Sequence, residues 1–295
     1  MEKICVIGAG TMGNGIAHVF AQFGFNVTLF DLQDDILRKA MAAIENNFDR
    51  QLKKEILTVE AKDRALKNIH VSTDLAKSVE DTDLVVEAVT ENFEIKKSIF
   101  SDLDKNCSAK TILATNTSSI SITKLAATTM RPEKVIGMHF MNPVPVMKLV
   151  EVIKGYNTSD AVTKAVLELS QKLDKIPLTV NDYPGFISNR ILMPMINEAI
   201  YSLYEGVAGA VEIDQIMELG MAHPMGPLKL ADFIGLDVCL SILEVLHHGF
   251  GNPKYAPCPL LVNMVNAGNL GVKSGIGFYD YRESRKNPQL ADQFA

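Results

Sequence analysis

The sequence predicts an α/β protein, with a mainly parallel sheet covered by helices on both faces and followed by an all-helical domain. Through residues 1–182, short apolar and β-branched runs alternate with amphipathic helical repeats, which is typical of a parallel sheet. From residue 183 to residue 295, β-branched runs are rare and helical periodicity dominates. We therefore expect one domain over 1–182 and a second over 183–295.

The first 31 residues form the clearest unit of this pattern. An apolar run at 3–8 precedes a stretch with helical spacing at 12–23, which Gly24 is expected to end. Residues 26–31 are again apolar and β-branched. Strand, turn, helix and strand within about thirty residues make a βαβ unit.

The remaining elements continue this alternation. In the first domain we expect strands at 84–89, 111–115, 135–139, 148–153 and 177–180, and helices at 34–57, 93–103 and 159–173. In the second domain we expect helices at 184–204, 211–219, 227–248 and 259–267. Residues 283–295 are polar and are expected to add little to the fold.

A glycine turn directly follows the first expected strand. Gly8 permits the tight turn, Gly10 lets the backbone approach a pyrophosphate, and Gly13 allows close packing of helix and strand. The start of the helix would then point N–H groups at the phosphates. A glycine turn without a ligand is the alternative, but the strand before it and the helix after it favour a Rossmann-type dinucleotide site.

Asp31 ends the second expected strand. A carboxylate there can accept both ribose hydroxyls of NAD and would repel the 2′-phosphate of NADP. No arginine follows within the next three residues, so we expect NAD(H) as cofactor. The alternative is that Asp31 is only a helix cap or turn residue.

His139 follows an apolar strand, at the end where α/β sheets expose functional groups. Glu151 lies on the next expected strand, after a proline-containing turn at 142–145. Two strands joined by that turn could bring imidazole and carboxylate into hydrogen-bond reach. The carboxylate would fix the tautomer and leave the second ring nitrogen to take a proton. Spacing alone leaves a structural histidine and a solvated glutamate open.

Composition narrows the class of protein. The chain has 295 residues, 47% of them hydrophobic, and a formal net charge of −6, which argues against nonspecific nucleic-acid binding. No apolar run is long enough to span a bilayer, and no signal or transit peptide is recognised, so we expect a cytoplasmic protein. The cysteines lack metal-ligand or disulfide spacing and are expected to be free in the core: Cys5, Cys107, Cys239 and Cys258.

These motifs together resemble the L-3-hydroxyacyl-CoA dehydrogenase family, over residues 3–281. Besides the glycine turn, Asp31, His139 and Glu151, the resemblance rests on the segments 116–119, 184–190, 223–227 and 275–279. Taken alone, segments 116–119 and 184–190 are most simply interpreted as helix caps or turns. Met141 departs from the phenylalanine common in the family, an apolar exchange of little consequence.

The resemblance implies a role for each matching residue. His139 would be the acid/base, with Glu151 to orient it, while Ser118 and Asn189 would bond the reacting oxygen of the substrate. Lys54 would meet phosphates of coenzyme A, although a lysine-rich helix surface is an equal alternative. The cofactor would contact these residues: Gly8, Ala9, Gly10, Thr11, Met12, Gly13, Asp31, Glu91, Lys96 and Asn116.

Within the family the chain is most similar to bacterial enzymes that act on 3-hydroxybutyryl-CoA. The implied reaction interconverts acetoacetyl-CoA and (S)-3-hydroxybutyryl-CoA with NAD(H), as part of fatty-acid and butanoate metabolism. The excess of large apolar residues in the second domain predicts a homodimer. The alternatives are a dehydrogenase of the same architecture for a sugar acid or a free β-hydroxy acid and, more remotely, a non-catalytic NAD-binding structural protein.

Overall fold

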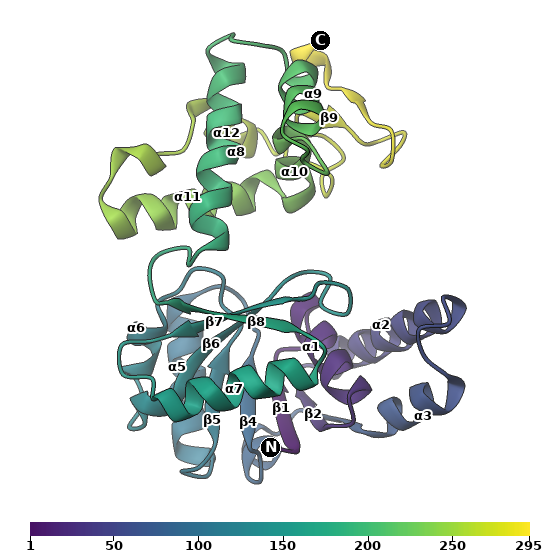
Figure 1. Ribbon diagram of the computed structural model, residues 1–295, viewed down its shortest axis with the longest axis vertical. Coiled ribbons are helices and arrows are strands. Elements are labelled where there is room, and N and C mark those ends of the chain that lie inside the picture. Colours follow the sequence, from purple (N-terminus) through teal and green to yellow (C-terminus); the bar gives the residue numbers. More distant parts are fainter. The chain divides into compact units, whose positions relative to one another are not determined.

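The computed structural model describes residues 1–295, which divide by their contacts into two compact units (Figure 1). The first unit is Met1–Tyr183 and the second is Pro184–Ala295. The first contains the sheet with its helices, and the second is mainly helical. The predicted fold class is confirmed.

The sheet of the first unit has eight strands in the order β3-β2-β1-β4-β5-β6-β7-β8. The first six are parallel to one another, β7 runs antiparallel to β6, and β8 is parallel to β7. The strands are β1 (Lys3–Ile7), β2 (Asn26–Phe30), β3 (Ile69–Ser72), β4 (Leu84–Glu87), β5 (Ile112–Thr115), β6 (Val135–Phe140), β7 (Leu149–Lys154) and β8 (Ile176–Asn181).

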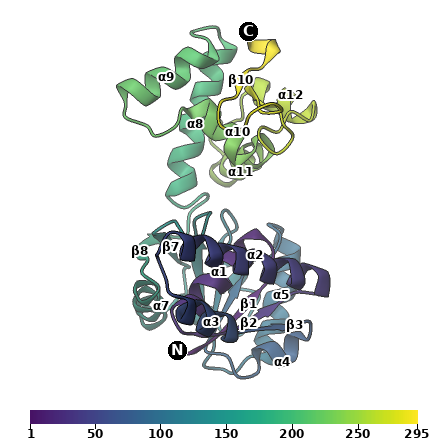
Figure 2. The ribbon, with the colours of Figure 1, turned by 90° about the vertical axis from the view of Figure 1, so that its right-hand side faces the viewer.

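Helices cover both faces of this sheet (Figures 1 and 2). On one face, α1 and α7 share a core with apolar side chains of the strands. Of the other helices, α5 packs against α4 and α6, and α6 contacts β6. The helices of the unit are α1 (Thr11–Gln22), α2 (Asp34–Lys53), α3 (Val59–Lys67), α4 (Leu75–Val79), α5 (Phe93–Asn106), α6 (Ile122–Ala126) and α7 (Asp160–Lys172).

Some short elements of the first unit were not predicted. They are β3, α3, α4 and α6, which have four to nine residues each and too few turns or alternations to give a clear period. The helix expected at 34–57 ends earlier, at Lys53, because Glu55 adopts a left-handed backbone conformation with φ of 56°.

Close packing of α1 on β1 depends on glycine. A Cβ at Gly13 would overlap the carbonyl oxygen of Gly8, so only glycine lets the helix lie this close to the strand end. A Cβ at Gly10, in contrast, would meet no atom within 4 Å. The turn therefore has one glycine that the packing requires and one that faces open space.

The second unit packs five helices around its own apolar core. They are α8 (Ser188–Tyr204), α9 (Ala210–Gly220), α10 (Pro227–Ile234), α11 (Leu236–Phe250) and α12 (Pro259–Asn266). The single helix expected at 227–248 is wrong: Gly235, with φ of 105°, separates α10 from α11. The helix expected at 184–204 begins later, at Ser188.

The expectation that residues 283–295 add little is also wrong. β10 (Gln289–Leu290) pairs antiparallel with β9 (Tyr279–Asp280), and Ala291 is fully buried. The preceding segment is fixed by Asp232, whose buried carboxylate accepts the N–H groups of Phe278 and Tyr279 and the hydroxyl of Tyr281. Composition alone gave no sign of these backbone contacts.

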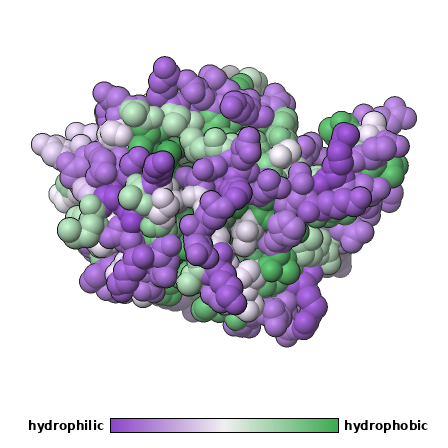
Figure 3. Space-filling model, turned by 90° about the horizontal axis from the view of Figure 1, so that it is seen from below, coloured by the Kyte–Doolittle hydropathy of each residue, from purple (hydrophilic) through white to green (hydrophobic).

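As expected from the sequence, all four cysteines are buried and none is paired in a disulfide. No helix is long and apolar enough to cross a membrane. The face shown in Figure 3 is mostly hydrophilic, with hydrophobic residues scattered among the polar ones, as on an ordinary solvated surface.

We expect Gly13→Ala to lower the stability of the first unit by about 3 kcal/mol, because the new methyl group must push α1 away from β1. For a unit of this size the melting temperature would fall by roughly 6–12 °C. Gly10→Ala is the matched control and should leave the melting temperature within about 1 °C, since nothing lies within 4 Å. Equal melting temperatures for the two variants would contradict this account of the turn.

Candidate active site

The glycine turn and Asp31 lie together at the ends of β1 and β2. The N–H of Ala9 donates to Asp31 Oδ2 at 2.9 Å, and the N–H of Gly8 donates to the carbonyl of Phe30 at 2.8 Å. Gly8 has a φ of 95°, which a residue with a side chain rarely adopts. The carboxylate is thus held beside the turn by the backbone of the turn itself.

The space beside the turn fits a dinucleotide. Gly10 is the N-cap of α1 and no side chain caps this helix, so the first N–H groups of the helix have no capping partner, and an added Cβ at Gly10 would meet no atom within 4 Å. The positive end of the helix dipole favours a phosphate there. Asp31 keeps further lone pairs beyond the bond from Ala9, as a ribose-binding carboxylate requires.

His139 and Glu151 form a buried pair across β6 and β7. The two residues are direct partners in the antiparallel register, and His139 Nδ1 lies 2.8 Å from Glu151 Oε2. They are only 6% and 3% exposed. A carboxylate accepts hydrogen bonds, so the shared hydrogen belongs to Nδ1 and the lone pair of the neutral ring lies on Nε2.

The segment after β5 connects this pair to the neighbouring strand ends. Asn116 Oδ1 accepts the N–H of Phe140 at 2.8 Å, next to His139. The N–H of Asn116 donates to the carbonyl of Glu87, at the end of β4, at 2.7 Å. Asn116 therefore fixes the ends of three adjacent strands relative to one another.

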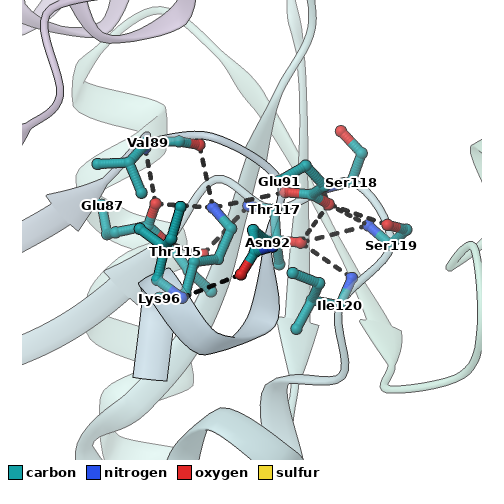
Figure 4. Close-up of polar contacts among 11 residues, drawn as sticks. Glu87, Val89, Glu91, Asn92, Lys96, Thr115, Thr117, Ser118, Ser119 and Ile120 are labelled. Carbon is teal, nitrogen blue, oxygen red and sulfur yellow. Dashed lines mark hydrogen bonds and ion pairs between the residues drawn. The ribbon is translucent and has the colours of Figure 1, made fainter. Parts of the chain in front are cut away.

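Glu91 holds the segment that contains Ser118 (Figure 4). One oxygen of Glu91 accepts the hydroxyl of Thr117 at 2.6 Å, the N–H of Ser118 at 2.9 Å, and both the N–H and the hydroxyl of Ser119. Burial raises the pKa of Glu91, but Lys96 and these hydroxyl and N–H donors outweigh burial and hold the pKa below its usual value. The carboxylate is thus ionised at neutral pH.

Lys96 and Glu87 form a second buried pair behind Glu91. Lys96 Nζ lies 2.7 Å from Glu87 Oε1, and the two side chains are 1% and 0% exposed. The same ammonium lies 3.4 Å from Glu91 Oε2. Sequence reasoning missed Glu87. The available signal was an acidic residue that ends the otherwise apolar strand 84–87.

Lys54 lines a cavity of the first unit. This cavity has a volume of about 550 Å³, and its lining includes one carboxylate, Asp174, which pairs with Lys148, and four cationic side chains: Arg50, Lys54, Lys148 and Lys175. Lys175 donates to the carbonyls of Val144 and Met147. Burial and then the charge of Lys148 lower the pKa of Lys175 to about 8. The cavity can therefore accommodate a negatively charged group.

Asn189 belongs to the second unit, in the first turn of α8, where it is buried. The chain enters this helix through Gly185, with φ of 73°, and a Cβ there would lie 2.6 Å from Leu246. The guanidinium of Arg190 stacks 4.6 Å above the ring of Phe250. These contacts fix the start of α8 within its own unit.

A parallel sheet with a glycine turn after β1 and a histidine–carboxylate pair at the end of β6 defines the class of nicotinamide-dependent dehydrogenases. The model of the 3-hydroxyacyl-CoA dehydrogenase NAD-binding domain matches residues 3–183, and that of the 3-hydroxyacyl-CoA dehydrogenase C-terminal domain matches residues 185–281. The chain belongs to the 3-hydroxyacyl-CoA dehydrogenase family, and the predicted resemblance is confirmed.

Individual relatives agree with this assignment. The chain is 54% identical over 288 residues to a 3-hydroxybutyryl-CoA dehydrogenase of Bradyrhizobium diazoefficiens, covering 98% of each chain. It is 56% identical over 279 residues to a probable 3-hydroxybutyryl-CoA dehydrogenase of Deinococcus radiodurans, covering 95% of this chain and all of the relative. The crystal structure of (S)-3-hydroxybutyryl-CoA dehydrogenase from Ralstonia eutropha matches with a TM-score of 0.93 and 50% identity, over 95% of this chain and 99% of that chain.

Proposed function

We propose that this protein is an NAD(H)-dependent dehydrogenase that interconverts acetoacetyl-CoA and (S)-3-hydroxybutyryl-CoA. The observation that supports it most is the 2.8 Å contact of His139 with Glu151 in an NAD-binding domain of this family. The names of the relatives at 54% and 56% identity support the four-carbon substrate.

His139 is the acid and base of the proposed reaction. During oxidation its Nε2 takes the proton of the 3-hydroxyl group, and during reduction it returns that proton to the carbonyl oxygen. Glu151 accepts the hydrogen of Nδ1 throughout, which fixes the ring orientation and stabilises the imidazolium formed in oxidation. Burial of both side chains strengthens this stabilisation because water screens the pair only weakly.

The cofactor site of the proposal is the turn from Gly8 to Gly13 with Asp31. The N–H groups of Thr11 and Met12 would bind the pyrophosphate, and Asp31 would accept the ribose hydroxyls. NAD, when bound there, supplies the hydride acceptor or donor for C3 of the substrate. The further cofactor contacts in this proposal are Ala9, Glu91, Lys96 and Asn116.

Other residues would bind the substrate. Ser118 and Asn189 are proposed to donate hydrogen bonds to the reacting oxygen, which keeps the hydroxyl oriented toward His139. Lys54, beside the cationic cavity of the first unit, is proposed to meet coenzyme A phosphates. We also propose that residues 1–182 form the NAD-binding domain and that residues 183–295 form the domain for substrate binding and dimerisation.

We also propose that the protein is cytoplasmic. Its four buried and unpaired thiols suit a reducing compartment, and cell fractionation would test this location. A four-carbon acyl-CoA substrate suits fatty-acid and butanoate metabolism. We propose neither a nucleic-acid partner nor a membrane partner.

The purified protein is expected to oxidise NADH when acetoacetyl-CoA is added, measured as loss of absorbance at the nicotinamide band. NADPH should support a lower rate, because the Asp31 carboxylate would repel a 2′-phosphate. Free acetoacetate and sugar acids serve as matched substrates without coenzyme A. Turnover of a free acid at a similar kcat/KM would favour the related dehydrogenase activity, and NADH binding without any turnover would favour a structural protein.

His139→Gln is expected to lower kcat by about a hundredfold to ten-thousandfold, because glutamine can bond to Glu151 but cannot take a proton. The Kd of NADH, from its fluorescence, should change less than about twofold. Glu151→Gln should also lower kcat, since the imidazolium loses its anionic partner. Turnover of His139→Gln close to that of the unmodified protein would rule out this histidine as the base.

We propose that the second unit forms a homodimer. Large apolar side chains are more than half exposed along α8, α9 and α10 and the segments that join them: Ile191, Tyr204, Val207, Ile216, Leu219, Met221 and Phe233. Light scattering should give about twice the 32.4 kDa of the chain. Leu219→Lys, 85% exposed in the single chain, should shift the mass toward the monomer, and Val71→Lys in β3 is the matched control. A monomeric unmodified protein would refute the dimer.

A further inference from the structure

We propose that Glu87 is a positioning residue for the dehydrogenase reaction, although it contacts none of the groups assigned to the substrate. It acts through Lys96 and Thr115 on residues 115–119, which comprise the last residue of β5 and the segment after it that includes Ser118. The inference rests on the proposed function, since it concerns the placement of Ser118. We call residues 115–119 the β5 loop.

Glu87 is a buried carboxylate with a complete set of donors. Its Oε1 accepts from Lys96 Nζ at 2.7 Å and from the N–H of Val89 at 2.7 Å, and its Oε2 accepts the hydroxyl of Thr115 at 2.6 Å. The side chain is fully inaccessible to solvent. A carboxyl group in such a place is tolerated because hydrogen-bond donors surround it.

The first route to the β5 loop passes through Thr115. Its hydroxyl donates to Glu87 and accepts the N–H of Thr117 at 3.2 Å. The carbonyl of Glu87 also accepts the N–H of Asn116. Side chain and backbone of Glu87 thus both define where the loop leaves β5.

The second route passes through Lys96 and Glu91 (Figure 4). Lys96 Nζ donates to Glu87 Oε1 at 2.7 Å and to the carbonyl of Val89 at 3.3 Å, and it forms an ion pair with Glu91 Oε2 at 3.4 Å. Glu91 in turn accepts the N–H groups of Ser118 and Ser119. Any displacement of Lys96 would therefore move the carboxylate that holds the backbone of Ser118.

The charge balance explains why Glu87 matters for position more than for stability. Two carboxylates share one ammonium, and the shorter contact is with Glu87. Without the charge on Glu87, the ammonium would move toward Glu91 and pull the β5 loop with it. A buried ion pair is often no more stabilising than apolar side chains of similar volume, so stability alone is a weak reason for this pair.

The test is a cycle of Glu87→Gln and Ser118→Ala, measured as kcat with acetoacetyl-CoA and NADH. Glu87→Gln alone should lower kcat about tenfold, because a shift of the loop of well under 1 Å already misaligns the hydroxyl of Ser118. In the Ser118→Ala background the same substitution should lower kcat less than twofold, since the group that it positions is gone.

Asp104→Asn is the matched control. Asp104 is also a nearly buried carboxylate on α5, and it pairs with Arg131 at 2.7 Å and accepts the N–H of Met130 at 2.8 Å, away from the β5 loop. This variant should lose stability but keep kcat. Should Glu87→Gln fail to fold, Thr115→Val removes one of the two routes while it leaves both charges in place, and a loss of kcat smaller than tenfold that disappears in the Ser118→Ala background is expected.

Amide hydrogen exchange gives a readout that does not need activity. Exchange in a peptide covering 115–119 should accelerate at least fivefold in Glu87→Gln and remain unchanged in Asp104→Asn. Unchanged exchange, or an equal loss of kcat with and without Ser118, would overturn the positioning role. If exchange is faster in Glu87→Gln but the unmodified protein shows no turnover, the proposed function is overturned and Glu87 remains the residue that orders the loop.

Discussion

The site depends on one constraint, the parallel order of the strands from β2 to β6. Parallel strands bring their carboxyl ends to one edge of the sheet, so groups distant in sequence meet there: Gly8, Asp31, Glu87, Asn116 and His139. The reversal of β7 adds the last group, because antiparallel strands place residues directly opposite each other and Glu151 faces His139. A shift of β7 by one residue would turn that carboxylate to the other face of the sheet.

Charge inside the first unit follows a consistent rule. The two glutamates that the sheet buries both have polar partners from neighbouring elements: Glu151 has His139, and Glu87 has Lys96 together with Thr115. Such pairs cost free energy to desolvate and tolerate little movement. At the sheet edge, these contacts fix the positions of the side chains relative to the strands that carry them.

The sequence predicted the fold class and the main strands because apolar runs and helical periods are local signals. It also placed His139 and Glu151 on neighbouring strands, since a short turn joins them. It did not reveal Glu87, whose partners lie 9 and 28 residues away and depend on three-dimensional contacts. The break at Gly235 was missed for a similar reason: glycine is compatible with a helix until packing demands its positive φ.

Asp232 has a consequence for how this chain tolerates being shortened. Its carboxyl group is buried beneath the segment 278–281 and accepts two backbone N–H groups and one tyrosine hydroxyl from it. Removing the chain from residue 278 onward would leave a buried carboxyl group without three of its hydrogen-bond donors and open the helical core to solvent. The C-terminal residues thus cover the core of the second unit. A tag fused to the C-terminus is compatible with the fold only when it begins beyond Ala291, which is fully buried.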